Sequence, residues 1–202
     1  NITKLCFSEH DYQYINITKV IDIIKMIKNN NYIKSLTLLI HDLGVHQELI
    51  SAIVDMLTYN TTLSELRLIY SNLSSTDIRN IIESLKSNTT LTKLILTNNN
   101  ICNIGLNQIA NMLKVNRTLK VINLYCNRFT DISELCDMLK VNNSLESLTM
   151  DMGQLPVDQL TSLTKALQIN TSIKKLNFTS YNVIYDFSEF INMLMINKSI
   201  KY

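Results

Sequence analysis

Histidine and cysteine are the residue types here that could act as nucleophiles, bases or metal ligands. The chain contains three histidines and four cysteines: His10, His41, His46, Cys6, Cys102, Cys126 and Cys136. A nucleophile needs a base within reach, and a structural zinc site needs several ligands at short spacings. The sequence has no Cys-x-x-Cys pair. His10 and His41 occupy equivalent positions of a repeat described below and could be a metal pair, but no third ligand accompanies them. We therefore expect no catalytic residue, no metal site, no cofactor and no enzyme activity.

Asparagine carries the other recognisable chemistry. The signature Asn-x-Ser/Thr accepts N-linked glycans in secreted proteins. Copies of it begin at Asn60, Asn88, Asn116, Asn142, Asn170 and Asn197. One interpretation is a glycosylated secreted protein. The other is a structural repeat, because the third residue after each of these asparagines is Leu or Ile.

Composition narrows the class of protein. The 202 residues are 46% hydrophobic with a net charge of +2, which excludes a disordered chain. This small net charge predicts no nucleic-acid partner and no membrane partner. The apolar runs are too short to span a bilayer. The four cysteines are sparse and irregularly spaced, which favours reduced thiols and a cytoplasmic protein rather than an N-glycosylated secreted one.

A repeat of about 28 residues runs through the chain. Its units open at Ile2, Ile33, Leu63, Leu91, Leu119, Leu145 and Ile173, with a further opening at Ile200. Unit positions 1, 4, 6 and 11 are apolar, and the alternation at positions 4 and 6 predicts a strand. The second half of each unit has helical periodicity. The expected helix stripes are Ile78, Ile81, Ile82 and Leu85 in one unit, and Ile104, Ile109, Ala110 and Leu113 in the next.

The unit resembles the leucine-rich repeat of the ribonuclease-inhibitor-like class, LxxLxLxxNxIxxxGxxxLAxxLKxNxTL. The unit at 91 matches it almost throughout, as Leu91, Leu94, Leu96, Asn99, Ile101, Gly105, Ala110, Leu113, Lys114, Asn116 and Thr118. The resemblance implies one α/β domain over residues 1–202, a right-handed solenoid (horseshoe) with parallel strands on the concave face and helices on the convex face. We expect it to be a fragment of a longer array.

The alignment of the repeats predicts structural roles for two sets of asparagines. The sequon asparagine is expected at the helix end in the left-handed conformation, so that Asn88→Gly would be tolerated. The asparagine at unit position 9 satisfies backbone groups in the family, but only Asn99 and Asn127 keep it. His10, His41, Ser71, Gly153 and Tyr181 replace it in the other units, where the turn is expected to be irregular.

Outward strand positions predict where a partner would bind. Unit positions 3, 5, 7 and 8 are expected to line the concave face. The apolar or anchoring residues among them are Leu39, Ile40, Arg67, Ile69, Tyr70, Ile95 and Tyr125. They fall in neighbouring units, and exposed apolar patches with aromatic and Arg anchors are typical of binding sites.

The predicted function is a protein–protein interaction module that binds a protein partner on the concave face. The abundance of Asn, Ile, Lys and Tyr indicates an AT-rich genome. Together with the resemblance, this suggests an effector or adaptor of an intracellular microbe or large virus. Such a protein would act in the cytosol, including a host cytosol. The alternatives are a GTPase-activating-type regulator, since one such family shares this repeat class, and a structural array without a dedicated partner.

Overall fold

The computed structural model describes residues 2–9, 15–152, 155–179, 186 and 188–201, in which strands and helices alternate. The strands are β1 (Lys4–Ser8), β2 (Ser35–Leu39), β3 (Glu65–Ile69), β4 (Lys93–Ile95), β5 (Val121–Asn123), β6 (Ser147–Asp151) and β7 (Lys175–Thr179). The helices are α1 (Ile17–Ile27), α2 (Gln47–Tyr59), α3 (Ser75–Ser87), α4 (Asn103–Val115), α5 (Ser133–Val141), α6 (Val157–Ile169) and α7 (Ser188–Ile196). A short 3-10 helix, η1 (Leu43–Val45), precedes α2.

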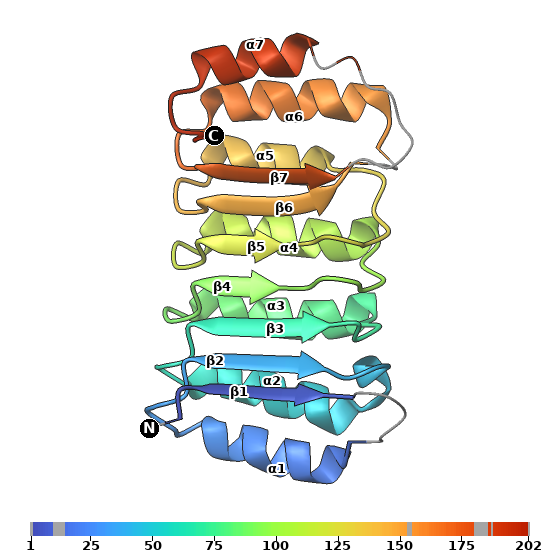
Figure 1. The fold of residues 1–202 in the computed structure, drawn as a ribbon, viewed down its shortest axis with the longest axis vertical. Helices are drawn as coiled ribbons and strands as arrows, with labels where there is room; N and C mark the ends of the chain where they lie inside the picture. The colour runs from blue at the N-terminus through green and yellow to red at the C-terminus, as the bar shows by residue number, and fades with distance from the viewer. Residues whose placement is uncertain (1, 10–14, 153–154, 180–185, 187, 202) are drawn as a thin grey trace.

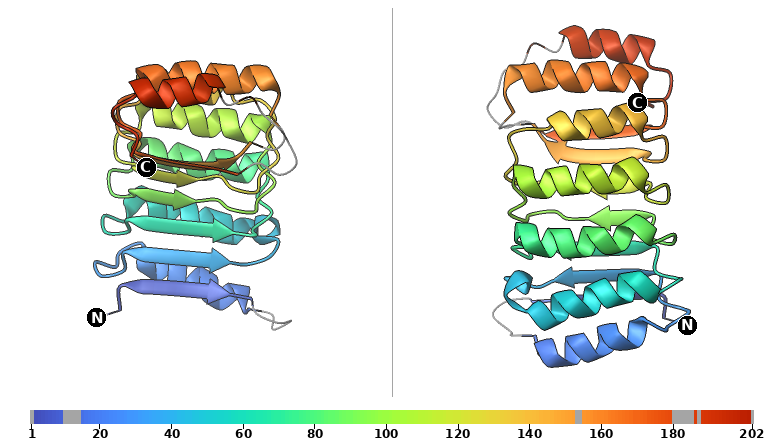
Figure 2. Two further views of the ribbon diagram at one scale, coloured as in Figure 1. Left: turned by 45° about the horizontal axis from the view of Figure 1, so that its top comes forward. Right: turned by 180° about the vertical axis from the view of Figure 1, so that it is seen from behind.

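The seven strands form one open parallel sheet in chain order. Leu36 lies beside Leu66, which lies beside Leu94, so equivalent unit positions stack in register. The strands form one layer and the helices a second layer behind it, as Figures 1 and 2 show from three directions. This is the α/β solenoid that the sequence predicted. None of the described helices is long and apolar enough to cross a membrane.

The core lies between the two layers and runs the length of the stack. Successive strand residues point to opposite faces, and the inward residues Leu66, Leu94 and Ile122 have no exposed surface. The predicted helix stripe of α3 is buried throughout, as is most of that of α4. Ile104 was wrongly placed in it and is 60% exposed, because Leu106 has the spacing that continues the inward row.

Asparagines that are buried, or half-buried at Asn197, join successive helix-to-strand turns to the turn before. In the central turn, Asn116 donates from Nδ2 to the carbonyl of Leu85 (2.7 Å). Its Oδ1 accepts from the backbone N–H groups of Thr118 (2.9 Å) and Leu119 (2.8 Å). The same bonds recur at Asn60, Asn88, Asn142, Asn170 and Asn197. We call these six residues the asparagine ladder.

The ladder corrects the expected backbone conformation. Asn88 has φ −68° and ψ 127°, which is extended rather than left-handed. Asn116 has the same geometry, with φ −68° and ψ 132°. The side chain, not a special backbone angle, makes asparagine necessary, so Asn88→Gly would remove bonds and is no longer expected to be tolerated. The Nδ2 atom, to which a glycan would be attached, already donates to a carbonyl of the preceding repeat.

The strand-to-helix turns differ from one repeat to the next. Asn99 and Asn127, at unit position 9, each donate to a carbonyl of the preceding repeat, and each follows a single left-handed residue. Where Ser71 replaces the asparagine, both of its neighbours are left-handed. Where His41 replaces it, the left-handed residue is Asp42 and η1 follows. The expected irregularity is therefore confirmed in these two turns; His10, Gly153 and Tyr181 lie outside the described residues.

Candidate partner-binding surface

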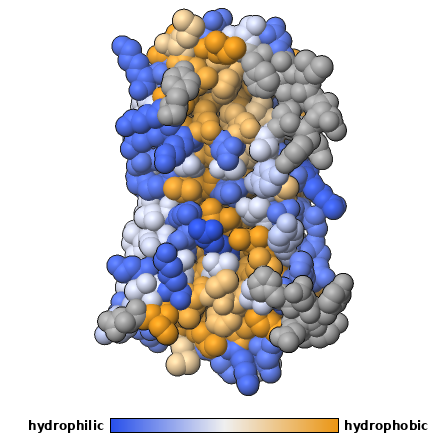
Figure 3. Space-filling view, in the orientation of Figure 1, coloured by the Kyte–Doolittle hydropathy of each residue, from blue (hydrophilic) through white to orange (hydrophobic). Residues whose placement is uncertain are grey.

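The outward face of the sheet is the surface on which the sequence placed a partner. Leu39 and Ile69 lie side by side in the register of β2 and β3, and both are half-buried. In Figure 3, which looks onto this face, apolar residues gather along the middle, with hydrophilic residues between some of them and on both sides. We call Leu39, Ile69 and Tyr70, from two neighbouring repeats, the apolar strip.

Two residues expected on this surface are buried. Ile40 has no exposed surface, because the alternation of β2 continues one residue beyond the strand and turns its side chain inward. Tyr70 occupies the same unit position but has a left-handed φ of 57°, and its side chain is 48% exposed. Ile95 is only 7% exposed and lies between Arg67 and Asn123 in the strand register.

Tyr70 lies at the end of this strip, and a second aromatic ring, that of His41, lies beside it. The ring of His41 lies 5.9 Å from that of Tyr70, tilted by 49°. The backbone N–H of His41 donates to the Glu9 carboxylate (2.8 Å), which fixes its turn to the preceding one. Tyr125 is half-buried and lies two repeats beyond Tyr70. The backbone at Thr97 lies between the two tyrosines, because the N–H of Tyr70 donates to the Thr97 carbonyl and the N–H of Asn98 donates to the Tyr125 carbonyl. Tyr125 therefore does not adjoin the strip.

The Glu65 carboxylate organises the charges beside the strip. It accepts from Arg67 Nη2 (2.7 Å) and from Lys93 Nζ (2.9 Å), and Ser35 Oγ donates to its other oxygen (3.2 Å). Burial raises the pKa of Glu65, but the hydrogen bonds from Lys93 and Arg67 outweigh burial and hold this pKa below its ordinary value. The cluster fixes Arg67 in one direction, which lowers the entropy cost of using it in an interface.

The cysteines do not assemble a reactive site. All four are free, and Cys136 is buried, which raises the pKa of its thiol to about 12. A hydrogen bond with Ser75, followed by the N–H of Gly105, lowers the pKa of Cys102. No group of three or more His, Cys, Asp or Glu suited to a metal ion occurs among the described residues.

The comparisons with known proteins agree with the geometry at the level of the fold. No family model and no curated protein sequence matches the chain. Among solved structures, leiomodin-1 actin-binding site 2 is similar with a TM-score of 0.59 at 17% identity, covering 92% of this chain and 91% of that one. The tropomodulin C-terminal domain of Caenorhabditis elegans has a TM-score of 0.59 at 19% identity, covering 73% of this chain and 92% of its own.

A third similar structure is the leucine-rich repeat-containing protein LegL7 from Legionella pneumophila. It has a TM-score of 0.59 at 18% identity, and the match covers 98% of this chain and 63% of that one. The chain therefore has the fold of a leucine-rich-repeat solenoid of the ribonuclease-inhibitor-like class. At these identities the likeness extends to the fold alone.

Proposed function

We propose that this solenoid is a protein-interaction module that binds a protein partner through the outward face of its sheet. The observation that carries the proposal is the apolar strip formed by Leu39, Ile69 and Tyr70, beside the fixed guanidinium of Arg67. Buried aromatic and arginine anchors surrounded by polar residues are typical of binding hot spots. Tyr125 extends the surface at a second point. Leiomodin-1 shows that a similar fold carries an actin-binding site in that protein.

Two features support a cytosolic setting for this function. The ladder asparagines use the Nδ2 atoms that a secretory glycan would need, and all four thiols are free. Both features fit a reducing compartment without N-glycosylation. An effector or adaptor role, in the cytosol of the producing cell or of a host, fits the same setting.

The GTPase-activating alternative needs a polar and basic rim on the strand-to-helix turns. In the described parts of these turns, Arg128 is the one Lys or Arg residue, whereas Glu9, Asp42, Asp131 and Asp186 are acidic. The scarcity of basic residues in these turns favours the interaction module. Stimulated GTP hydrolysis by a panel of small GTPases would reverse this preference.

A photo-crosslinking amino acid at Ile69 tests the proposal, with the same substitution at Asn177 of β7 as the matched control on the same face. The Ile69 position should crosslink one partner that the Asn177 position does not. With that partner purified, Leu39→Ser together with Tyr70→Asn should raise Kd at least tenfold, because the apolar contacts are lost. Asparagine is chosen at position 70 because it tolerates the left-handed conformation there, so the turn should keep its shape. Equal crosslinking at both positions, or an unchanged Kd, would overturn the proposal.

A further inference from the structure

The helix-to-strand turns bring most of the basic side chains to one edge of the solenoid. We define the ladder edge as residues 28–34, 58–64, 86–92, 114–120, 140–146, 168–174 and 195–201. Its basic residues are Lys28, Lys34, Lys86, Lys114, Arg117, Lys120, Lys140, Lys174, Lys198 and Lys201, and its one acidic residue is Glu146. In Figure 3 this edge lies on the left and is mostly hydrophilic.

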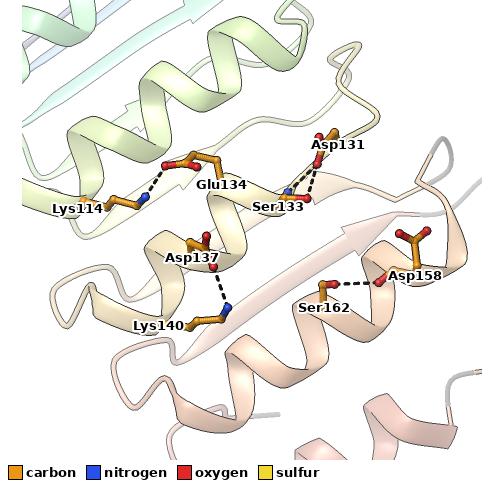
Figure 4. Close-up of polar contacts among 8 residues, drawn as sticks. All are labelled: Lys114, Asp131, Ser133, Glu134, Asp137, Lys140, Asp158 and Ser162. Carbon is orange, nitrogen blue, oxygen red and sulfur yellow. Dashed lines mark hydrogen bonds and ion pairs between the residues drawn. The ribbon is translucent and has the colours of Figure 1, made fainter.

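The opposite edge is acidic. From the strand ends to the first turns of the next helices, its described acidic residues are Glu9, Asp42, Glu48, Asp77, Asp131, Glu134, Asp151, Asp158, Asp186 and Glu189. In Figure 4, Asp131 and Asp158 lie at the helix starts and Lys114 and Lys140 near the helix ends. The two edges meet across the helices, because Glu134 pairs with Lys114 and Asp137 pairs with Lys140. The net charge of +2, which predicted no membrane partner, conceals these two oppositely charged edges.

Helix dipoles account for only part of the basic charge. The seven helices run in the same direction, and each places about half a negative charge at its C-terminal end, or roughly 3.5 charges in total. Five of the ten basic residues are paired with acidic side chains: Lys28 with Asp55, Lys86 with Glu83, Lys114 with Glu134, Lys140 with Asp137 and Lys174 with Glu146. The other five, Lys34, Arg117, Lys120, Lys198 and Lys201, form no salt bridge with a described acidic residue. These five charges exceed the roughly 3.5 negative charges of the helix ends, so the edge keeps a small positive excess.

The same edge exposes a row of apolar side chains. The residue immediately before a ladder asparagine is Tyr59, Val115, Val141, Ile169 or Ile196 in five of the turns, and each is between 56% and 64% exposed. The ladder bonds join consecutive turns, so these equivalent positions follow one another along the edge. Four of them, from Val115 to Ile196, occupy consecutive repeats.

We propose that the ladder edge docks on an anionic lipid surface. Lysine and arginine near an anionic bilayer each contribute attraction, and apolar side chains between them enter the headgroup boundary. The apolar row distinguishes this partner from nucleic acid, whose phosphates make no use of Val and Ile. A protein would need a pocket for each of these separated side chains, whereas a lipid layer admits them wherever they fall. The inference does not depend on the partner proposed for the sheet face.

Vesicle co-sedimentation of the whole chain tests this docking. The chain should sediment with vesicles of equal parts phosphatidylcholine and phosphatidylserine, but not with phosphatidylcholine alone, and high salt should release it. Arg117→Gln, Lys120→Gln and Lys198→Gln together should weaken binding about 100-fold, at roughly fivefold for each charge. These side chains take part in no side-chain ion pair of the core, so the fold should persist.

The apolar row has its own matched control. Val141→Ser with Ile169→Ser should weaken vesicle binding at least tenfold. Ile104→Ser with Val157→Ser removes equally exposed aliphatic groups from the opposite edge and should leave binding unchanged. Equal losses in the two double variants, or no sedimentation with phosphatidylserine, would overturn the proposal. So would binding of an RNA oligonucleotide or of poly-glutamate in place of the vesicles.

Discussion

Each repeat turns twice, and the two turns obey different constraints. At the helix-to-strand turn, an asparagine makes the same bonds in repeat after repeat, from Asn60 to Asn197. At the strand-to-helix turn, equivalent positions hold asparagine, serine or histidine, and the left-handed residue changes place. A turn is held to one residue type when a single side chain must satisfy backbone groups of two repeats at once. Where local backbone geometry can substitute, the sequence is free to vary.

The largest effect is expected from placing a charge in the helix-to-strand turn. Asn116→Asp keeps the acceptor oxygen but replaces the donor that faces the Leu85 carbonyl with a buried negative charge. The free energy of unfolding should fall by about 4 kcal/mol in urea titrations near neutral pH. Burial raises the pKa of a carboxyl above its unfolded value, so the loss should shrink as the pH falls and the carboxyl regains a proton to donate.

The neighbouring turn supplies the control. Asn143→Asp makes the same chemical change one residue after a ladder asparagine, at an exposed side chain. Its cost should stay below about 0.5 kcal/mol, as for other surface substitutions. If both variants lose the same stability, the ladder is not what fixes the turn.

A smaller effect is expected when a variable turn loses its asparagine. Asn99→Ser copies the residue of the preceding repeat, Ser71, and leaves the Leu68 carbonyl without the Asn99 donor. The loss should be about 2 kcal/mol by thermal or urea unfolding. A loss as large as that of Asn116→Asp would remove the distinction between the two turns.

A steric test probes the most irregular of the variable turns. A Cβ added to Gly44 would lie 3.0 Å from both the carbonyl oxygen of Asn72 and Oδ2 of Asp77. Gly44→Ala should therefore cost about 1 kcal/mol, because the neighbouring turn must shift. Unchanged or raised thermal stability would show that this turn adapts more readily than its packing suggests.

The smallest effect belongs to the sheet face, outside both turns. The lowered pKa of Glu65 means that its contribution to stability is present above its unfolded pKa, close to 4.5, and is lost as the pH falls through the folded value. Glu65→Gln should reduce the unfolding free energy by about 0.5 kcal/mol at pH 7 and by progressively less at acidic pH. A loss that is constant with pH would contradict this role of the carboxylate.

Periodicity was sufficient to predict the fold. The alternation at unit positions 4 and 6 located the strands and the buried row through Leu94, because burial between two layers leaves a pattern in residue type. The surface was harder to predict. Ile40 and Tyr70 share a unit position, yet one points inward and the other outward, since a left-handed φ at Tyr70 reverses the direction of its side chain. A single unit's residue types contain no signal for that angle.

The ladder also makes folding and glycosylation compete for the same atoms. An oligosaccharide added to Asn116 in an extended, newly made chain would block the bond to Leu85, and five other acceptor sites carry the same liability. Production in a secretory expression host would then create a kinetic trap, in which each modified chain is barred from its native stack. A bacterial host, or retention in a eukaryotic cytosol, would avoid this competition. Glycan occupancy at these sites would therefore show whether each chain was glycosylated before it folded.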